Sequence, residues 1–327
     1  MSTSSGQRPL RPAARLIYRL ITFIALLSVS ALLLGSMGGW YWPFDLFAHF
    51  RVHSTFALLV CAIALLSLRD FRGGVIAILA AVLGALPLVD YLVPSREPLE
   101  LESSGSLRVL SLNAWFRNDD PNRLVEYLET SGADVIVLQE LSEDEGRALH
   151  ARLKVYPYAF VEGASASDAV LLSRWPISAS DVVPLVSDGV GVIRATIDWQ
   201  GKSFTLIGAH LHWPIGPRSA ERRNSELAGL ALLAQSQHEP LVILGDFNIT
   251  PWSSHFETFL QVSGLRDCAR GNGLDPTWPS QFILAGIRID HCFMSAHWRA
   301  LDAHTGPHVG SDHRPMIVEL ELRQARQ

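Results

Sequence analysis

Three apolar segments within the first hundred residues constrain this chain most, because they separate a membrane part from a polar remainder. They cover about 17–37, 53–68 and 74–94. An α-helix rises about 1.5 Å per residue, so roughly 20 apolar residues cross the hydrocarbon layer of a bilayer. The first and third segments are long enough, and the second is marginal. We interpret all three as transmembrane helices, with buried helices of a soluble domain as the alternative.

Arginines indicate how these helices would lie in a bilayer. The basic residues around the first segment and between the second and third are Arg8, Arg11, Arg15, Arg19, Arg69 and Arg72. The positive-inside rule assigns both groups to the cytoplasmic side, with residues 1–16 as a cytoplasmic segment. Three crossings of the inner or plasma membrane then place the rest of the chain outside the cytoplasm, in the periplasm. If the second segment does not cross, the rest lies inside.

The remaining chain divides into a linker at 95–106, a domain at 107–322 and a short tail at 323–327. Residues 1–100 carry 8 Lys and Arg against 5 Asp and Glu, so residues 101–327 have 19 basic against 27 acidic side chains. A tight nonspecific grip on nucleic acid needs a basic face. The acidic balance therefore argues against a dedicated nucleic-acid binder.

The sequence of this domain predicts many strands with few helices between them. Residues 107–115 alternate apolar and polar side chains, whereas the strands expected at 134–140 and 241–246 contain the continuous aliphatic runs 135–138 and 241–244, typical of strands buried on both faces. Further strands are expected at 169–173, 190–199, 204–210, 287–293 and 316–322, and helices at 219–236 and 252–262. This pattern predicts two packed sheets with helices outside, an α/β or α+β sandwich.

Polar residues gather where the predicted strands end. They are Asn113, Glu140, His210, Asp246, Asn248, Asp312 and His313, with Asp290 inside a further strand. Each alone is an ordinary turn former or structural residue. Carboxylates and carboxamides without cysteine suit Mg²⁺, or alternatively Mn²⁺, rather than structural zinc. Cys61, Cys268 and Cys292 lack metal-type spacing, and the last two are either paired or free and buried.

Six motifs carry a family resemblance. They are Leu-Asn-Ala-Trp (112–115), Val-Leu-Gln-Glu (137–140), Gly-Ala-His-Leu (208–211), Gly-Asp-Phe-Asn (245–248), Arg-Ile-Asp-His (288–291) and Gly-Ser-Asp-His-Arg-Pro (310–315). In this order they resemble the endonuclease/exonuclease/phosphatase superfamily, and the membrane segments resemble a membrane-anchored bacterial branch. The resemblance implies a four-layered α/β sandwich, with two mixed sheets flanked by helices, and metal-dependent cleavage of phosphate esters by water.

The resemblance also implies roles for the acidic and amide residues. Glu140 would be the principal metal ligand, with Asn113 and Asp312 close to the ion. Asp246 would orient and deprotonate the attacking water, and Asn248 would hold the phosphate or that water. A bound cation offsets charge that develops on phosphorus, and a positioned carboxylate activates water.

The histidines complete the implied site. His313 would contact the phosphoryl oxygens, with Asp290 fixing its ring, and His210 would stabilise or protonate on the other side. Histidine at 210 matches the deoxyribonuclease and sphingomyelinase branches, while Trp115 stands where repair nucleases often have an acidic residue. This combination disfavours abasic-site repair. Arg222 and Arg223 are either phosphate contacts or part of a solvated helix face.

These features predict a membrane-anchored, Mg²⁺-dependent hydrolase of phosphodiester or phosphomonoester bonds. A small phosphodiester or a phospholipid head group is the expected substrate, and the bilayer is the expected partner, with no protein partner. One alternative is an extracytoplasmic endonuclease or exonuclease acting on DNA or RNA. The other is a catalytically silent, membrane-anchored binding module. Loss of hydrolysis on added salt would favour nucleic acid, since its affinity falls steeply with ionic strength.

Overall fold

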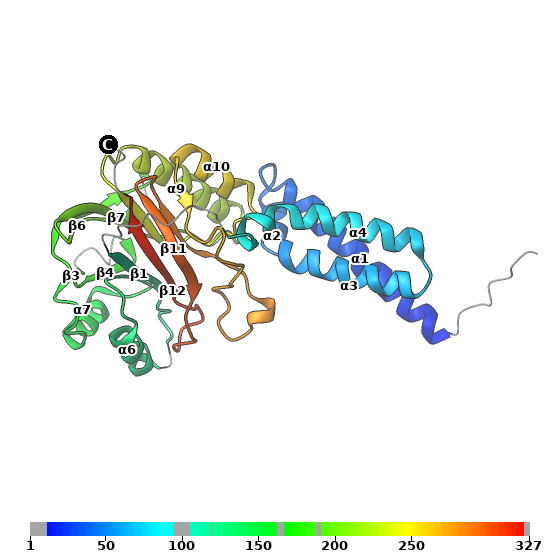
Figure 1. Cartoon of the computed structure of the whole chain (residues 1–327), viewed down its shortest axis with the longest axis horizontal. Helices are drawn as coiled ribbons and strands as arrows, with labels where there is room; N and C mark the ends of the chain where they lie inside the picture. The colour runs from blue at the N-terminus through cyan, green and yellow to red at the C-terminus, as the bar shows by residue number, and fades with distance from the viewer. Residues whose placement is uncertain (1–11, 95–104, 119, 162–166, 188–190, 324–327) are drawn as a thin grey trace, which may run out of the picture.

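A computed structural model describes residues 12–94, 105–118, 120–161, 167–187 and 191–323 of the chain. The described residues form an elongated helical bundle joined to an α/β sandwich (Figure 1). Most of the predicted linker, at 95–104, lies outside the described residues. So do residues 1–11 of the predicted cytoplasmic segment and 324–327 of the predicted tail.

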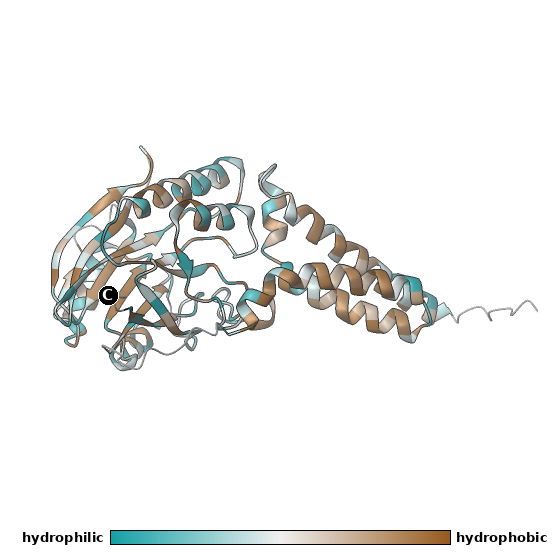
Figure 2. Cartoon of the chain, turned by 45° about the horizontal axis from the view of Figure 1, so that its top comes forward, coloured by the Kyte–Doolittle hydropathy of each residue, from teal (hydrophilic) through white to brown (hydrophobic). Residues whose placement is uncertain are grey.

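The bundle contains the three apolar segments. Its helices are α1 (Pro12–Ser36), α2 (Trp42–Ala48), α3 (Arg51–Ser67), α4 (Phe71–Ala85), η1 (Leu86–Leu88) and α5 (Val89–Leu92). Among the described residues, Pro12–Ser36 and Phe71–Leu92 are long and apolar enough to cross a bilayer. The α2–α3 pair, bent by 59°, would be a third span if it counts as one. Apolar residues run along most of the bundle (Figure 2).

The direction of the helices separates the two ends of the bundle. The start of α1 and the turn between α3 and α4 lie at the end far from the sandwich, whereas α2 lies against the sandwich (Figure 1). Leu58 and Leu65 of α3 belong to one buried cluster with Ala77 and Ala81 of α4, and residues of α1 pack against it. Helix α3 therefore runs alongside both of its neighbours.

The sandwich is built from two six-stranded sheets. One sheet has the order β11 (Trp298–Thr305), β12 (Met316–Leu322), β1 (Ser106–Asn113), β2 (Val135–Gln139), β4 (Ala169–Ser173), β3 (Tyr158–Phe160). The other has the order β5 (Ile177–Pro184), β6 (Gly191–Trp199), β7 (Lys202–His210), β8 (Leu241–Asp246), β10 (Asp290–Met294), β9 (Arg266–Asp267). Both sheets contribute to one apolar core between them, with Val137 and Leu244 among its members.

Helices cover the outer face of each sheet. The first sheet buries its outer residues with α6 (Pro121–Thr130) and α7 (Glu143–Arg152). The second does so with α9 (Pro217–Gln235) and α10 (Ser254–Ser263). This arrangement confirms the predicted four-layered α/β sandwich.

Local sequence explains where these helices begin. Helix α7 starts at a capping box, because Ser142 Oγ accepts from Glu145 N and Ser142 N donates to Glu145 Oε2. Asp120 caps α6, just before Pro121 in its first turn, and Ser253 caps α10.

Two parallel strand pairs set the position of the polar residues. β1 pairs with β2 in parallel, and β7 pairs with β8 in parallel. Parallel neighbours end at the same edge of a sheet. The residues at or just after those ends, Asn113 and Glu140 in one sheet and His210 and Asp246 in the other, therefore lie at one edge of the sandwich.

Two buried contacts attach the sandwich to the bundle. Tyr91 of α5 is 3% exposed within the core between the sheets, and its hydroxyl donates to Asp267 Oδ2 over 2.9 Å. Asp45 of α2 forms an ion pair with Arg223 of α9 at 2.7 Å. Because a buried charge is costly without its partner, these contacts fix how the two parts meet.

Candidate active site

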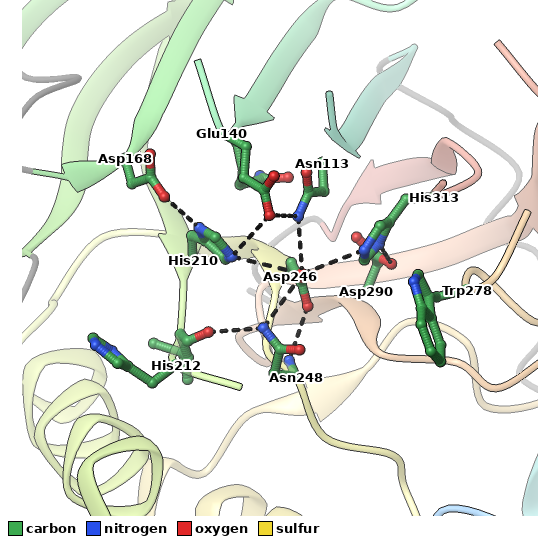
Figure 3. A network of polar contacts seen from close by, with 12 residues as sticks. Asn113, Glu140, Asp168, His210, His212, Asp246, Asn248, Trp278, Asp290 and His313 are labelled. Carbon is green, nitrogen blue, oxygen red and sulfur yellow. Dashed lines mark hydrogen bonds and ion pairs between the residues drawn. The ribbon is translucent and has the colours of Figure 1, made fainter. Parts of the chain in front are cut away.

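Asp246 is the centre of the polar cluster at the strand ends (Figure 3). In the sheet register it lies opposite His210 on one side and Asp290 on the other. Its side chain is buried. Asp246 Oδ1 accepts from Asn248 N at 2.9 Å, and Asp246 Oδ2 accepts from Asn113 Nδ2 at 3.2 Å. One carboxylate thus joins residues from both sheets.

Burial changes the acidity of Asp246. Loss of solvent penalises the charged form, and the carboxylate of Asp290 adds to this, whereas His313 and His210 act in the opposite direction. The net effect raises the pKa of Asp246 to about 6. A carboxylate with this pKa releases and accepts protons close to neutral pH, as a general base must.

Two histidines flank Asp246, and each is held by another carboxylate. His313 Nδ1 lies 2.8 Å from Asp290 Oδ2, and His210 Nδ1 lies 2.8 Å from Asp168 Oδ2. An ionised carboxylate only accepts, so each Nδ1 carries the donated proton. The Nε2 atoms lie 3.8 Å (His313) and 3.7 Å (His210) from Asp246 Oδ2. These separations exceed a hydrogen bond, which leaves both Nε2 groups able to reach a substrate oxygen.

Neighbouring carboxylates raise the pKa of both imidazoles against the effect of burial. Burial by itself lowers the pKa of His313, but Asp290 and Asp246 outweigh it and raise the pKa to about 10. Burial likewise opposes the charge on His210, and the hydrogen bond to Asp168 with the nearby carboxylates raises its pKa. His313 is therefore a cationic donor at neutral pH, and the carboxylates favour the protonated form of His210 in the same way.

Glu140 and Asn113 approach Asp246 from the other sheet. Asn113 Nδ2 donates to Glu140 Oε1 at 2.9 Å, and Phe116 N donates to Glu140 Oε2 at 3.3 Å. Asn113 Oδ1 accepts from Trp115 N at 3.0 Å. The side-chain nitrogen of Asn113, rather than its side-chain oxygen, thus faces the two carboxylates. A metal bond from Asn113 Oδ1 would therefore require the side chain to rotate.

Asp312 lies beside His313 at the rim of the site. Its Oδ2 accepts from Trp278 Nε1 at 3.1 Å, and its backbone oxygen accepts from Ser280 N at 2.7 Å. Its charge also contributes to the raised pKa of His313. The structure brings Asn113, Glu140, Asp246, Asn248 and His210 into direct or near contact, and Asp312 joins through His313.

The chemistry of these residues fits a divalent cation. The carboxylates around the two histidines are Glu140, Asp168, Asp246, Asp290 and Asp312. Among the described residues, Asp290 Oδ1 and Asp312 Oδ1 are buried without a hydrogen-bond partner. Ligand atoms of Asp246, Asp290 and His313 lie within 4.8 Å of one another. Hard oxygen ligands with excess negative charge suit Mg²⁺ or Mn²⁺.

Sequence reasoning did not identify Asp168 or Glu226, and it misassigned Arg223. Asp168 precedes a strand instead of ending one, although the antiparallel pairing of β4 with β2 brings it to the same edge. Glu226 of α9 accepts from His212 N at 2.9 Å and pairs with His212 Nδ1 at 2.7 Å. Arg223, interpreted as a phosphate contact or a solvated residue, is neither, because it is buried against Asp45. The available signal was the position of Arg223 and Glu226, two charged residues on the buried, apolar face of helix α9.

Comparison with known proteins agrees with this geometry. The family model described as "Endonuclease/Exonuclease/phosphatase family" matches residues 110–313. Comparison with curated proteins gave no match.

Several solved structures share the fold. An endonuclease/exonuclease/phosphatase from Beutenbergia cavernae is 21% identical, with a TM-score of 0.56, 66% of this chain covered and 72% of that chain. D. rerio TDP2 complexed with single-strand DNA product is 16% identical, with a TM-score of 0.56 and coverages of 66% and 99%. Sphingomyelinase C from Streptomyces griseocarneus is 17% identical, with a TM-score of 0.51 and coverages of 66% and 99%. Because the family model spans most of the sandwich and every motif lies at its strand ends, this chain belongs to the endonuclease/exonuclease/phosphatase family.

Proposed function

We propose that this protein is a membrane-anchored, Mg²⁺-dependent phosphoesterase that cleaves phosphodiester or phosphomonoester bonds by attack of water, with Mn²⁺ as an alternative ion. One observation carries the proposal. Asp246, with a pKa raised to about 6, lies between two histidines, each of which is bonded to a carboxylate that raises its pKa and favours its protonated form. A base next to two imidazole proton donors is the combination needed to activate water and protonate a leaving oxygen.

The residues divide the work by their protonation. Asp246 takes the proton of the attacking water, and the hydrogen bond from Asn248 N to its Oδ1 fixes the direction of the carboxylate. His313 Nε2 and His210 Nε2 donate to phosphoryl and leaving oxygens. Asp290 and Asp168 orient the two rings.

Glu140 is the principal metal ligand in this proposal, with Asp312 near the ion. When bound, the cation supplies Lewis-acid charge neutralisation for a phosphoryl oxygen. Asn113 Nδ2, which contacts both Glu140 and Asp246, orients these carboxylates.

An apolar loop beside the site favours a lipid head group as substrate. Backbone hydrogen bonds between Trp278 and Ile287 close its base, and Trp278 contacts Asp312. Its tip exposes Phe282 by 67% and Leu284 by 96%. The tip helix η2 (Ile283–Ala285), orange in Figure 1, lies on the side of the sandwich nearest the bundle. Exposed apolar side chains on that side suit the interfacial region of a bilayer.

The test uses the full-length protein reconstituted in lipid nanodiscs. Its substrates are sphingomyelin, phosphoinositides, bis-nitrophenyl phosphate, plasmid DNA, single-stranded DNA and RNA, each with Mg²⁺, with Mn²⁺ and with a chelator. We expect turnover of a lipid or small diester that stops with the chelator. Cleavage of nucleic acid alone would instead favour the nuclease alternative, and silence on every substrate would favour the binding module.

Matched variants separate the assigned site from contaminating activity. Glu140→Gln and Asp246→Asn each remove one carboxylate charge and should lower kcat by about 10²–10³-fold. Glu129→Gln makes the same change on the exposed face of α6 and should leave kcat unchanged. Equal activity in all three variants would refute the assignment.

A further inference from the structure

We infer that Asp45 and Arg223 are positioning residues through which helix α2 of the bundle holds the loop after β8, which contains Asn248, in place. The inference rests on the proposed function, because in that function Asn248 of this loop orients the base Asp246. Asp45 and Arg223 are 178 positions apart in sequence, and each comes from a different part of the molecule. Their contact adjoins the active site, because Arg223 Nη1 also donates to the backbone oxygen of Asn248.

The guanidinium of Arg223 joins three segments. The Arg223 side chain is 1% exposed, and its Nη2 donates to Asp45 Oδ2 at 2.7 Å. Its Nη1 donates to the backbone oxygen of Asn248 at 3.0 Å, and its Nε donates to Asn224 Oδ1 at 2.8 Å. The planar fork of arginine allows these separate contacts to be made at once.

Both carboxylate oxygens of Asp45 also accept hydrogen bonds. The residue is 2% exposed, and its Oδ1 accepts from Ser253 Oγ at 2.5 Å. Ser253 is also the N-cap of α10. The carboxylate of Asp45 therefore connects α2 to both helices that cover this sheet, and its removal would leave the charge of Arg223 buried without a counterion.

The connection continues into the chemistry through Asn248. This residue has a left-handed backbone conformation, with φ of 50°, which a non-glycine residue keeps only when its surroundings fix it. Arg223 holds the backbone oxygen of Asn248, and the Asn248 side chain donates from Nδ2 to Leu211 O at 2.9 Å. Asn248 N in turn donates to Asp246 Oδ1. Three consecutive hydrogen bonds thus lead from Asp45 to the base.

A purely structural pair and a positioning pair differ in one measurable way. Arg223→Met leaves Asp45 buried without its charge partner, so it lowers stability whichever role applies. The double variant Asp45→Asn with Arg223→Met removes both charges, and such balanced removal costs much less stability. It does not restore the donor to Asn248 O. Stability and catalysis therefore separate in the double variant only if the pair positions the loop.

The experiment compares the wild type, Arg223→Met, Asp45→Asn and the double variant in nanodiscs. For Arg223→Met we expect kcat about 10–100-fold lower with KM within about threefold, as for a misplaced catalytic group. In the double variant the melting temperature should return toward the wild type while kcat stays low. Recovery of kcat together with stability would overturn the inference, as would unchanged kcat in Arg223→Met. If that single variant does not fold, the double variant still decides.

A readout independent of turnover keeps the two proposals distinguishable. Hydrogen–deuterium exchange over peptides covering 246–252 should rise in the double variant and stay unchanged in Arg218→Met, which alters an exposed arginine of the same helix. A wild type that hydrolyses no phosphoester refutes the proposed function, whereas unchanged exchange in the double variant refutes the positioning role.

Discussion

At the scale of single residues, the site works through opposite effects on acids and bases. Burial raises the pKa of Asp246, while carboxylates raise the pKa of His313 and His210 against the effect of burial. Asp246 is therefore deprotonated and His313 protonated between about pH 6 and about pH 10, and the raised pKa of His210 extends its protonated form in the same direction. This effect follows from the packing of five carboxylates around the two imidazole rings.

The pH dependence of kcat/KM tests this assignment. Catalysis needs ionised Asp246 and protonated His313, whose pKa values are raised to about 6 and about 10. We expect kcat/KM to fall about tenfold per pH unit below 6, and to fall again at alkaline pH once His210 or His313 loses its proton, at the latest above about 10. A pH titration against bis-nitrophenyl phosphate measures this, with circular dichroism as the check on folding. An acid limb centred near 4 would contradict the role of Asp246.

Asp168 provides a second test at this scale. In Asp168→Asn, His210 loses the carboxylate that supports its charge, so its pKa should fall and kcat should decrease about 10–100-fold. The alkaline limb of the pH profile should also move to lower pH. Asp144→Asn, an exposed aspartate of α7, is the control. An unchanged alkaline limb would show that Asp168 does not support His210.

The site residues that could be predicted from the sequence lie at the ends of aliphatic strands. Asp246 and Glu140 follow continuous aliphatic runs, so their strands and ends were predictable. Asp168 follows no such run, and the charge pair of Arg223 with Asp45 depends on a contact across 178 positions. Local patterns carry no information about such distant contacts, and the geometry of Asn113, whose amide nitrogen faces the carboxylates, was equally hidden.

At the scale of elements, close approach of β7 and β8 positions His210 next to Asp246. Gly245 precedes Asp246 with φ of 154°, and a Cβ there would collide with the backbone oxygen of Ala209. Glycine is thus required for the two parallel strands to deliver both side chains to one point.

Gly245→Ala should therefore destabilise the sandwich by at least about 2 kcal/mol, from combined backbone strain and overpacking. Gly264→Ala is the matched control, because Gly264 also has a positive φ of 70° but no atom within 4 Å of the added Cβ. It should cost about 1 kcal/mol. Urea unfolding of both variants measures the difference, and equal free energies of unfolding would exclude the collision.

The apolar loop is a second element with a testable role. Replacing Phe282 and Leu284 by Ser should slow hydrolysis of lipid in vesicles at least about tenfold, because apolar area that enters the interface is lost. Turnover of soluble bis-nitrophenyl phosphate should not change. Val155→Ser, another exposed apolar residue, is the control. Equal loss on both substrates would place the effect within the site rather than at the bilayer.

Sequence patterns predicted central strands better than edge strands. The runs behind β2, β4 and β8 are continuous and aliphatic, because these strands are buried on both faces. β3, β5, β9 and β11 lie at or beside sheet edges, where pairing depends on distant neighbours. Their sequences carry weak alternation, so neither they nor the full strand order followed from local pattern.

At the scale of the whole molecule, the arginines and the bundle direction agree. Arg15, Arg19, Arg69 and Arg72 lie toward the end of the bundle far from the sandwich (Figure 1). From the positive-inside rule we predict that this end of the bundle lies in the cytoplasm and that the sandwich lies outside it.

Reporter fusions test this topology. Alkaline phosphatase fused after residue 327 should be active, whereas green fluorescent protein exported unfolded at the same position should be dark. Fusions after Leu68, in the turn between α3 and α4, should give the opposite pattern. Fluorescence at the C-terminus would place the catalytic domain inside the cell.

The buried attachment of Tyr91 to Asp267 and of Asp45 to Arg223 has a kinetic consequence. In the proposed membrane-anchored enzyme, a domain fixed on its bundle would hold the edge that carries Asp246 at one height above the bilayer and would diffuse only laterally. For a lipid substrate, encounters then occur in two dimensions, so the rate follows the mole fraction of that lipid in the leaflet. Diluting the vesicles would leave it unchanged, and diluting the substrate with inert lipid would lower it.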